Sequence, residues 1–257
     1  MKRRGRERRG RPAPAPVAVR TEFAQAEIVA EASARTLFLD GREAGVVDLD
    51  DPRRLVFAYM RRIADLIDAF RPSGSAIDVF HVGGGACALP RYVEVTRPRS
   101  RQLVWEIDPG VVALAREHLG LRHFPRLRVK VGDAAELIRA RPDRSADLVI
   151  GDAFDGPHVP APLSTPAFAA QVRRVLRPAG VYALNVIDIP PLEEVKLHDA
   201  LLRDAFTHVA WVAPPGVLRE RAPGNVVLFG SDVPLPLDAL HRAAAAAVPR
   251  EQLLVRA

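Results

Sequence analysis

The sequence of 257 residues contains a single cysteine, Cys87. One cysteine excludes an intramolecular disulfide framework and a zinc site built from cysteines. The seven histidines are scattered without the spacing of metal ligands, so we expect no metal site. No apolar run is long enough to span a membrane, and the N-terminus lacks the apolar region of a signal peptide. These absences favour a soluble, cytoplasmic protein that has no membrane partner.

The net charge of +6 comes from one end of the chain. Residues 1–20 hold eight Lys or Arg side chains and one Glu, a net charge of +7, so the other residues carry about −1. A basic segment of this kind can contact nucleic acid. Its repeated Ala-Pro steps favour the plainer interpretation, a solvated and disordered tail over residues 1–20.

Apolar and turn-forming residues divide the rest of the chain into three parts. Residues 21–52 predict a small β-hairpin region, because two strand-like runs flank the turn signal Asp40-Gly41. Asp50 or Asp51 followed by Pro52 predicts the start of a helix. We expect the main domain over residues 53–232. We expect a C-terminal helix and tail over residues 233–257, in which the helix is Ala-rich and covers 238–247.

The main domain alternates between short apolar runs and segments with helical spacing. The apolar runs lie near 77–82, 102–107, 127–131, 146–150, 181–186, 208–212 and 225–229. Strands separated by single helices predict a doubly wound, mostly parallel sheet of seven strands, an α/β fold of the Rossmann-like type. No helical pattern separates the last two runs, so we expect the seventh strand to be antiparallel.

A glycine turn and an acid point to a nucleoside. The apolar run 79–82 ends in Gly83, Gly84 and Gly85, and Glu106 ends the next run 23 residues after Gly83. Glycines let the backbone approach a ligand closely, and a carboxylate on the neighbouring strand can accept hydrogen bonds from two ribose hydroxyls. We therefore expect this end of the sheet to bind a nucleoside.

Three further acids follow the next two predicted strands. Asp133 comes after the third strand and can accept a hydrogen bond from an adenine amino group, whereas Asp152 and Asp155 follow the fourth. Ligands of such sheets bind at the carboxyl ends of the strands, where these acids gather. Paired carboxylates facing a bound nucleoside can hold an ammonium group, or take the proton that an amine loses before it attacks carbon.

Taken together, these motifs resemble those of the spermidine synthases, the polyamine aminopropyltransferases, whose fold is that of class I methyltransferases with an added N-terminal β domain. The motifs that carry the resemblance are Gly83-Gly84-Gly85, Glu106-Ile107-Asp108, Gly132-Asp133-Ala134 and Asp152-Ala153-Phe154-Asp155. It implies a role in polyamine biosynthesis, with a small-molecule amine as acceptor and decarboxylated S-adenosylmethionine as donor. It also implies a homodimer.

The resemblance implies a role for each motif. Glu106 would hold the ribose, and Asp133 with Ala134 would hold the adenine. The backbone of the glycine turn would lie close to the bound nucleoside. Asp152 would orient and deprotonate the attacking amine, and Asp155 would assist it.

Two departures from the family pattern leave other functions open. The family's glycine motif continues with an Asp that grips the amino group of the donor, and this chain has Ala86 there. A family Tyr-Gln pair is replaced by Tyr59-Met60. Without the Asp, intact S-adenosylmethionine is no longer repelled, so a methyltransferase on the same scaffold is one alternative. A homologue that only binds its ligand is another. A dinucleotide-dependent oxidoreductase also fits the glycine spacing, but it would leave Asp133 and Asp152 unexplained.

Overall fold

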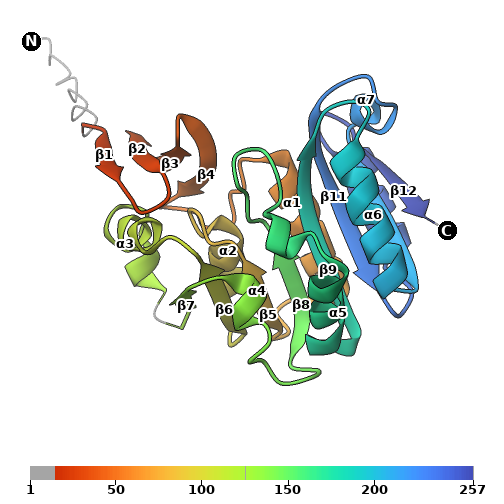
Figure 1. Cartoon of the computed structure of the whole chain (residues 1–257). Coiled ribbons are helices and arrows are strands. Elements are labelled where there is room, and N and C mark those ends of the chain that lie inside the picture. Colours follow the sequence, from red (N-terminus) through yellow and green to blue (C-terminus); the bar gives the residue numbers. More distant parts are fainter. Residues whose placement is uncertain (1–14, 125, 257) are drawn as a thin grey trace, which may run out of the picture.

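The computed structural model describes residues 15–124 and 126–256 (Figure 1). The first part is an antiparallel sheet in the order β1-β2-β3-β4. Its strands are β1 (Val17–Arg20), β2 (Gln25–Glu31), β3 (Ala34–Leu39) and β4 (Arg42–Asp48). Asp40 and Gly41 both have positive φ angles, of 49° and 74°, which a two-residue hairpin turn requires.

Two boundaries near the N-terminus differ from the prediction. The disordered tail was expected to reach residue 20, but β1 occupies Val17–Arg20 and pairs with β2; residues 1–14 lie outside the described part of the chain. The first long helix, α1 (Ala58–Phe70), begins after the predicted start at Asp50 or Asp51. The side chain of Asp48 accepts hydrogen bonds from the backbone N–H groups of both residues, and this local turn replaces the predicted helix cap.

The second part is a large sheet with the strand order β12-β10-β11-β9-β8-β5-β6-β7. Strands β5 to β9 run parallel to one another, and β11 lies antiparallel between β9 and β10. This confirms the α/β class, the mostly parallel sheet and the antiparallel last strand of the predicted seven. The bounds are β5 (Asp78–Val82), β6 (Arg101–Glu106), β7 (Arg128–Val131), β8 (Ala146–Gly151), β9 (Leu176–Asp188), β10 (His208–Ala213), β11 (Gly224–Ser231) and β12 (Gln252–Arg256).

The predicted strand count was too low. Among the residues that the structure describes, this sheet has eight strands, because β12 pairs antiparallel with β10 at the edge. The prediction gave this segment to a C-terminal tail. β12 has only five residues and no regular alternation of buried and exposed positions, so its sequence carries little strand signal. The Ala-rich helix before it is present as α8 (Leu237–Ala246).

Helices cover both faces of the large sheet. One apolar cluster joins the sheet to α1, α2, α3 and α8, and a second joins it to α4, α5 and α6. The remaining elements are α2 (Ala88–Thr96), α3 (Pro109–His118), η1 (Leu121–His123), α4 (Ala134–Leu137), η2 (Ala161–Leu163), α5 (Pro166–Val175), α6 (Glu193–Ala205) and α7 (Pro215–Leu218). No helix in residues 15–124 and 126–256 combines the length and the apolar character needed to cross a membrane.

The N-terminal sheet lies against the carboxyl ends of the large sheet. Thr21 donates a hydrogen bond to Asp108, whose other oxygen accepts from Gly110 and caps α3. Next to this link, a Cβ added to Gly45 of β4 would lie 2.7 Å from the Cβ of Ala86. The two sheets therefore meet around the glycine turn that follows β5.

Candidate active site

A cleft of about 1390 Å³ lies between the N-terminal sheet and the carboxyl ends of the parallel strands. It is lined by β3 and β4, by the start of α1, and by the loops that follow β5, β6, β7 and β8. β9 and β11 close one end of it. All the predicted site residues except Gly84 line this cleft, and Gly84 lies directly behind it.

The glycine turn is held against the end of β8. Gly83 has a φ of 92°, and a Cβ added there would lie 2.3 Å from the carbonyl oxygen of Asp152. The Asp152 N–H in turn donates to the carbonyl of Val82 at 2.8 Å. Because no side chain fits at position 83, the glycine sets how closely the turn and Asp152 approach each other.

Glu106 binds the glycine turn directly. Its Oε2 accepts hydrogen bonds from the N–H groups of Gly84 and Gly85, both at 2.9 Å, and its Oε1 accepts one from Asp108 N–H at 3.0 Å. The side chain is 9% exposed and lines the cleft. The structure thus brings together the two motifs that predicted a nucleoside site. A carboxylate has about four lone-pair directions, so one remains here on Oε1.

Asp133 lies at the end of the neighbouring strand. Its Oδ1 accepts a hydrogen bond from Ala135 N–H at 2.8 Å and so caps α4. Asp133 and the buried Ala134 line the cleft beside Glu106, since the Gly132 N–H donates to the Glu106 carbonyl at 2.9 Å. Within the described residues, the second oxygen of Asp133 accepts no hydrogen bond, so it remains available to a ligand.

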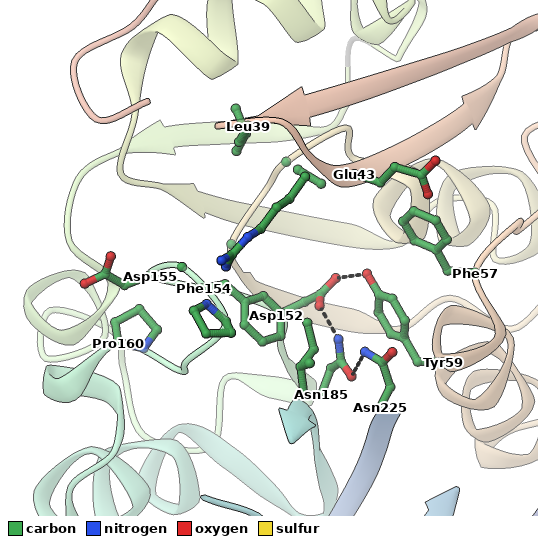
Figure 2. Close-up of a pocket in the computed structure, with 18 of the residues that line it drawn as sticks. Leu39, Glu43, Phe57, Tyr59, Asp152, Phe154, Asp155, Pro160, Asn185 and Asn225 are labelled. Carbon is green, nitrogen blue, oxygen red and sulfur yellow. Dashed lines mark hydrogen bonds between the residues drawn. The ribbon is translucent and has the colours of Figure 1, made fainter. Parts of the chain in front are cut away.

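Asp152 is held by side chains from three other elements (Figure 2). The Tyr59 hydroxyl on α1 donates to Oδ2 at 3.0 Å, and the Asn185 amide on β9 donates to Oδ1 at 2.9 Å. Asn225 on β11 donates to the Asn185 oxygen at 3.0 Å, which leaves the NH₂ group of Asn185 facing Asp152. These four residues, hereafter the Asp152 group, fix the carboxylate in one orientation.

Burial changes the acidity of this carboxylate. It raises the pKa of Asp152 to about 6, although the hydrogen bonds from Asn185 and Tyr59 act in the opposite direction. The pKa of Tyr59 is raised well above its usual value by burial and by the adjacent Asp152 charge, so Tyr59 stays protonated and donates. A carboxyl with a pKa near neutrality is suited to accept and release a proton.

The structure does not bring the two loop acids together. Asp155 is exposed, and Figure 2 shows its carboxylate pointing away from Asp152. The Asp155 and His158 backbones pair with each other across a tight turn, which places Asp155 near the tip of the loop. Asp155 still lines the cleft, and its assisting role stays a prediction.

Asn185 and Asn225 were not among the predicted site residues. Asn185 is 1% exposed, and it interrupts the apolar run of its strand. A buried amide in an apolar strand needs hydrogen-bond partners, so this interruption was the available signal. Tyr59 was placed correctly on its helix, but nothing in the local pattern indicated a contact with Asp152.

Ala86 does not line the cleft. Its side chain is 3% exposed, packs against Gly45, and borders a small cavity of about 30 Å³ behind the glycine turn. The expectation that position 86 faces the tail of the donor is therefore wrong for this chain. The reason is the close approach of β4, since the N-terminal sheet covers the helix start at this point.

Substituting Ala86 with Asp tests this packing. We expect Ala86→Asp to lower the free energy of unfolding by about 3 kcal/mol, because a carboxylate would be forced into a filled, buried site. Urea denaturation measures the effect, and Ala140→Asp, at an exposed position, is the control. Equal stability of both variants would show that position 86 has room for a side chain that reaches the cleft.

The fold and the site together define a class. A sheet in this order, with a glycine turn after its first parallel strand and an acid at the end of the second, is that of the class I methyltransferase-type nucleoside-binding proteins. Human methyltransferase-like protein 13 in complex with SAH shares the fold, with a TM-score of 0.58 and 22% identity over 73% of this chain and 92% of that one.

Within this class, the chain belongs to the spermine/spermidine synthase family, because residues 56–214 match the model of the spermine/spermidine synthase domain. A probable spermidine synthase from Corynebacterium glutamicum ATCC 13032 superposes with a TM-score of 0.86 and 30% identity, over 94% of this chain and 91% of that one. The polyamine aminopropyltransferase of Vibrio vulnificus is 28% identical over 157 residues, which is 59% of this chain. The match spans about half, 51%, of that relative's length.

Proposed function

We propose that the protein transfers an aminopropyl group from decarboxylated S-adenosylmethionine to an amine. The observation that carries this proposal is the Asp152 group, which holds a half-buried carboxylate with a pKa of about 6 beside the glycine turn. Family membership supports the same reaction and does not favour methyl transfer. A homodimer stays a prediction of the family resemblance, and sedimentation equilibrium measures it.

The donor half of the cleft fits an adenosyl group. Glu106 has a free lone-pair direction for ribose hydroxyls, and Asp133 has a free oxygen for the adenine amino group. Gly83, Gly84, Gly85 and Ala134 present backbone and small side chains, which allow the nucleoside to approach closely. No three His, Cys, Asp or Glu side chains gather as a metal site in the part of the chain that the structure describes.

The other half of the cleft provides the chemistry. An alkyl amine has a pKa of about 10 and reaches the site as an ammonium ion, which has no lone pair for attack. Asp152 binds this ion and takes one proton, and the neutral nitrogen then attacks the carbon next to the sulfonium. The C–N bond forms as the C–S bond breaks, and the sulfur leaves as the neutral thioether methylthioadenosine. Asp155, which lines the cleft, would assist Asp152.

A product assay tests the proposal. Purified protein is incubated with an amine panel and either the decarboxylated or the intact donor, and products are identified by mass spectrometry. We expect methylthioadenosine and an aminopropylated amine from the decarboxylated donor alone. S-adenosylhomocysteine from the intact donor would establish methyl transfer instead, and donor binding without either product would establish a binding protein.

The pKa of Asp152 predicts how the activity depends on pH. Proton acceptance needs the carboxylate form, so activity should fall as the pH drops through about 6. Asn185→Leu removes a hydrogen bond that lowers this pKa, so it should shift the midpoint of the acid limb to higher pH. Profiles of kcat/KM against pH for both proteins with one amine measure the shift. An unchanged midpoint in the variant would exclude Asp152 as the titrating group.

A further inference from the structure

The acceptor half of the cleft contains an arginine that has no ion-pair partner in the part of the chain that the structure describes. Arg42 is the first residue of β4, is exposed, and lines the cleft. Its Nη1 lies 3.7 Å from where a Cβ of Gly156 would stand, in the loop that begins with Asp152. Within residues 15–124 and 126–256, its guanidinium forms no ion pair and no side-chain hydrogen bond.

Asp40, Glu43, Asp152 and Asp155 line the same cleft, but within the described residues none of them forms an ion pair with Arg42. Arg62 forms ion pairs with Glu251 at 3.4 Å and with Asp65 at 3.1 Å, so that pair of acids is already engaged. Glu43 follows Arg42 in the strand, and Figure 2 shows its carboxylate pointing away from the Asp152 group. The carboxylate of Asp155 also points away from Asp152.

This distribution of charge disfavours a simple diamine. If one ammonium group binds at Asp152, a second ammonium near Gly156 would meet the like charge of Arg42 in a partly enclosed cleft. A carboxylate at that place would instead gain the paired hydrogen bonds that the flat guanidinium group offers. The walls of the cleft also include the apolar side chains Phe57, Phe154 and Ile187, which suit a chain of methylene groups.

The position of Arg42 along the chain also fits a role in acceptor choice. The match to the family domain covers residues 56–214, which include Glu106, Asp133 and Asp152. Arg42 lies before that range. The donor site and the base thus belong to the shared domain, whereas Arg42 comes from a segment outside it.

We propose that the acceptor is an amino acid whose amine is separated from its carboxylate by a methylene chain, with Arg42 binding the carboxylate. This inference rests on the proposed aminopropyl transfer. The amine nitrogen forms a bond to the aminopropyl carbon, the C–S bond of the donor breaks, and the amine proton passes to Asp152. The products are an N-aminopropyl amino acid and methylthioadenosine, so no further reactant is needed.

The test compares acceptors and charge variants. The acceptors are putrescine and linear ω-amino acids of three to six carbons, each with the decarboxylated donor. The proteins are the unmodified chain, Arg42→Gln, Arg42→Glu, and the control Arg53→Gln, which alters an exposed arginine outside the cleft. Release of methylthioadenosine gives kcat and KM, and mass spectrometry identifies the alkylated product.

We expect an ω-amino acid to be used better than putrescine. Arg42→Gln should raise its KM by about tenfold or more with little change in kcat, because the lost contact holds the acceptor and not the reacting atoms. Arg42→Glu should reverse the preference toward putrescine, and Arg53→Gln should leave both values unchanged. Efficient use of putrescine with no use of ω-amino acids would overturn this inference and leave aminopropyl transfer standing.

Two further measurements decide the remaining outcomes. If no acceptor releases methylthioadenosine, the proposed function fails, and calorimetry of ω-amino acids on the protein loaded with methylthioadenosine decides the inference. Binding that is lost in Arg42→Gln would support Arg42 as the site of the amino-acid carboxylate without an acceptor role, and no binding would overturn the inference. Titration with intact and decarboxylated donor completes the test. Selective weakening of the intact donor in Arg42→Gln would assign Arg42 to a donor carboxylate and overturn the acceptor role.

Discussion

Replacing Asp152 with Asn is expected to lower kcat by about 10²–10⁴-fold, the usual contribution of a general base. Asn keeps the size of the side chain and can still pair with Tyr59 and Asn185, but it cannot take a proton from the amine. Single-turnover release of methylthioadenosine measures the chemical step. Affinity for methylthioadenosine should stay within a few-fold, because the predicted donor contacts lie at Glu106 and Asp133.

The control for this substitution is Asp143→Asn. Asp143 lies in the turn that precedes β8, at the opposite end of the strand from Asp152, with a side chain 71% exposed. It should retain full activity. If Asp152→Asn also retained activity, the assignment of Asp152 as the base would be wrong, and the amine would have to lose its proton elsewhere.

The same substitution should not destabilise the protein. The pKa of Asp152 is about 6 in the folded state and 3.8 by its ordinary value, so the folded state binds this proton more tightly than the unfolded state does. Its contribution to stability therefore falls as the pH rises from about 4 to about 6, and the loss persists at higher pH. At neutral pH, Asp152→Asn removes this cost, and its melting temperature should equal or exceed that of the unmodified chain. The melting temperature thus distinguishes a loss of activity caused by unfolding from one caused by the missing base.

Substituting Glu106 with Ala should raise the Kd for methylthioadenosine by about 10- to 100-fold, because the charge-assisted hydrogen bond that its remaining lone pair can accept from a ribose hydroxyl would be lost. The variant would also leave the N–H groups of Gly84 and Gly85 without their acceptor, so the turn itself would loosen. Isothermal titration calorimetry measures the affinity. Glu136→Ala, at a side chain 64% exposed on α4, is the control.

The kinetic signature separates binding from chemistry. With a saturating donor, Glu106→Ala should recover much of its kcat, since Glu106 does not take part in proton transfer. Unchanged affinity for methylthioadenosine in this variant would contradict the ribose role. A loss of kcat that a saturating donor does not restore would show that the glycine turn also positions the reacting carbon.

Local signals in the sequence were enough to predict that the residues proposed to bind the donor lie together. Strand-length apolar runs place their final residues at one edge of a parallel sheet, so the glycine turn, Glu106, Asp133 and Asp152 could be grouped without coordinates. Their contacts follow from strand order alone. Asp108, two residues beyond Glu106, caps α3 in the structure.

The Asp152 group could not be predicted because it depends on pairing between distant segments. Asn185 and Asn225 are 40 residues apart, and they meet because β11 pairs with β9 in a register that makes them diagonal neighbours. Register of this kind has no local sequence signal. For Asp155 the local signal was misleading. Its spacing from Asp152 suggested that the two carboxylates form a pair, but a tight turn in the loop directs the Asp155 carboxylate away from Asp152.

Because β11 lies between β9 and β10, the orientation of Asp152 depends on the order in which the strands are synthesised and join the sheet. β9 and β10 come earlier in the chain, so the edge of β9 stays uncovered until the later strand arrives and Asn225 reaches Asn185. A nascent chain that ends soon after β10 already contains the residues of the donor half, but not the amide that orients Asn185. Alignment of Asp152, the proposed base, therefore coincides with the addition of β11 to the sheet, so the proposed activity would report that β11 is in place.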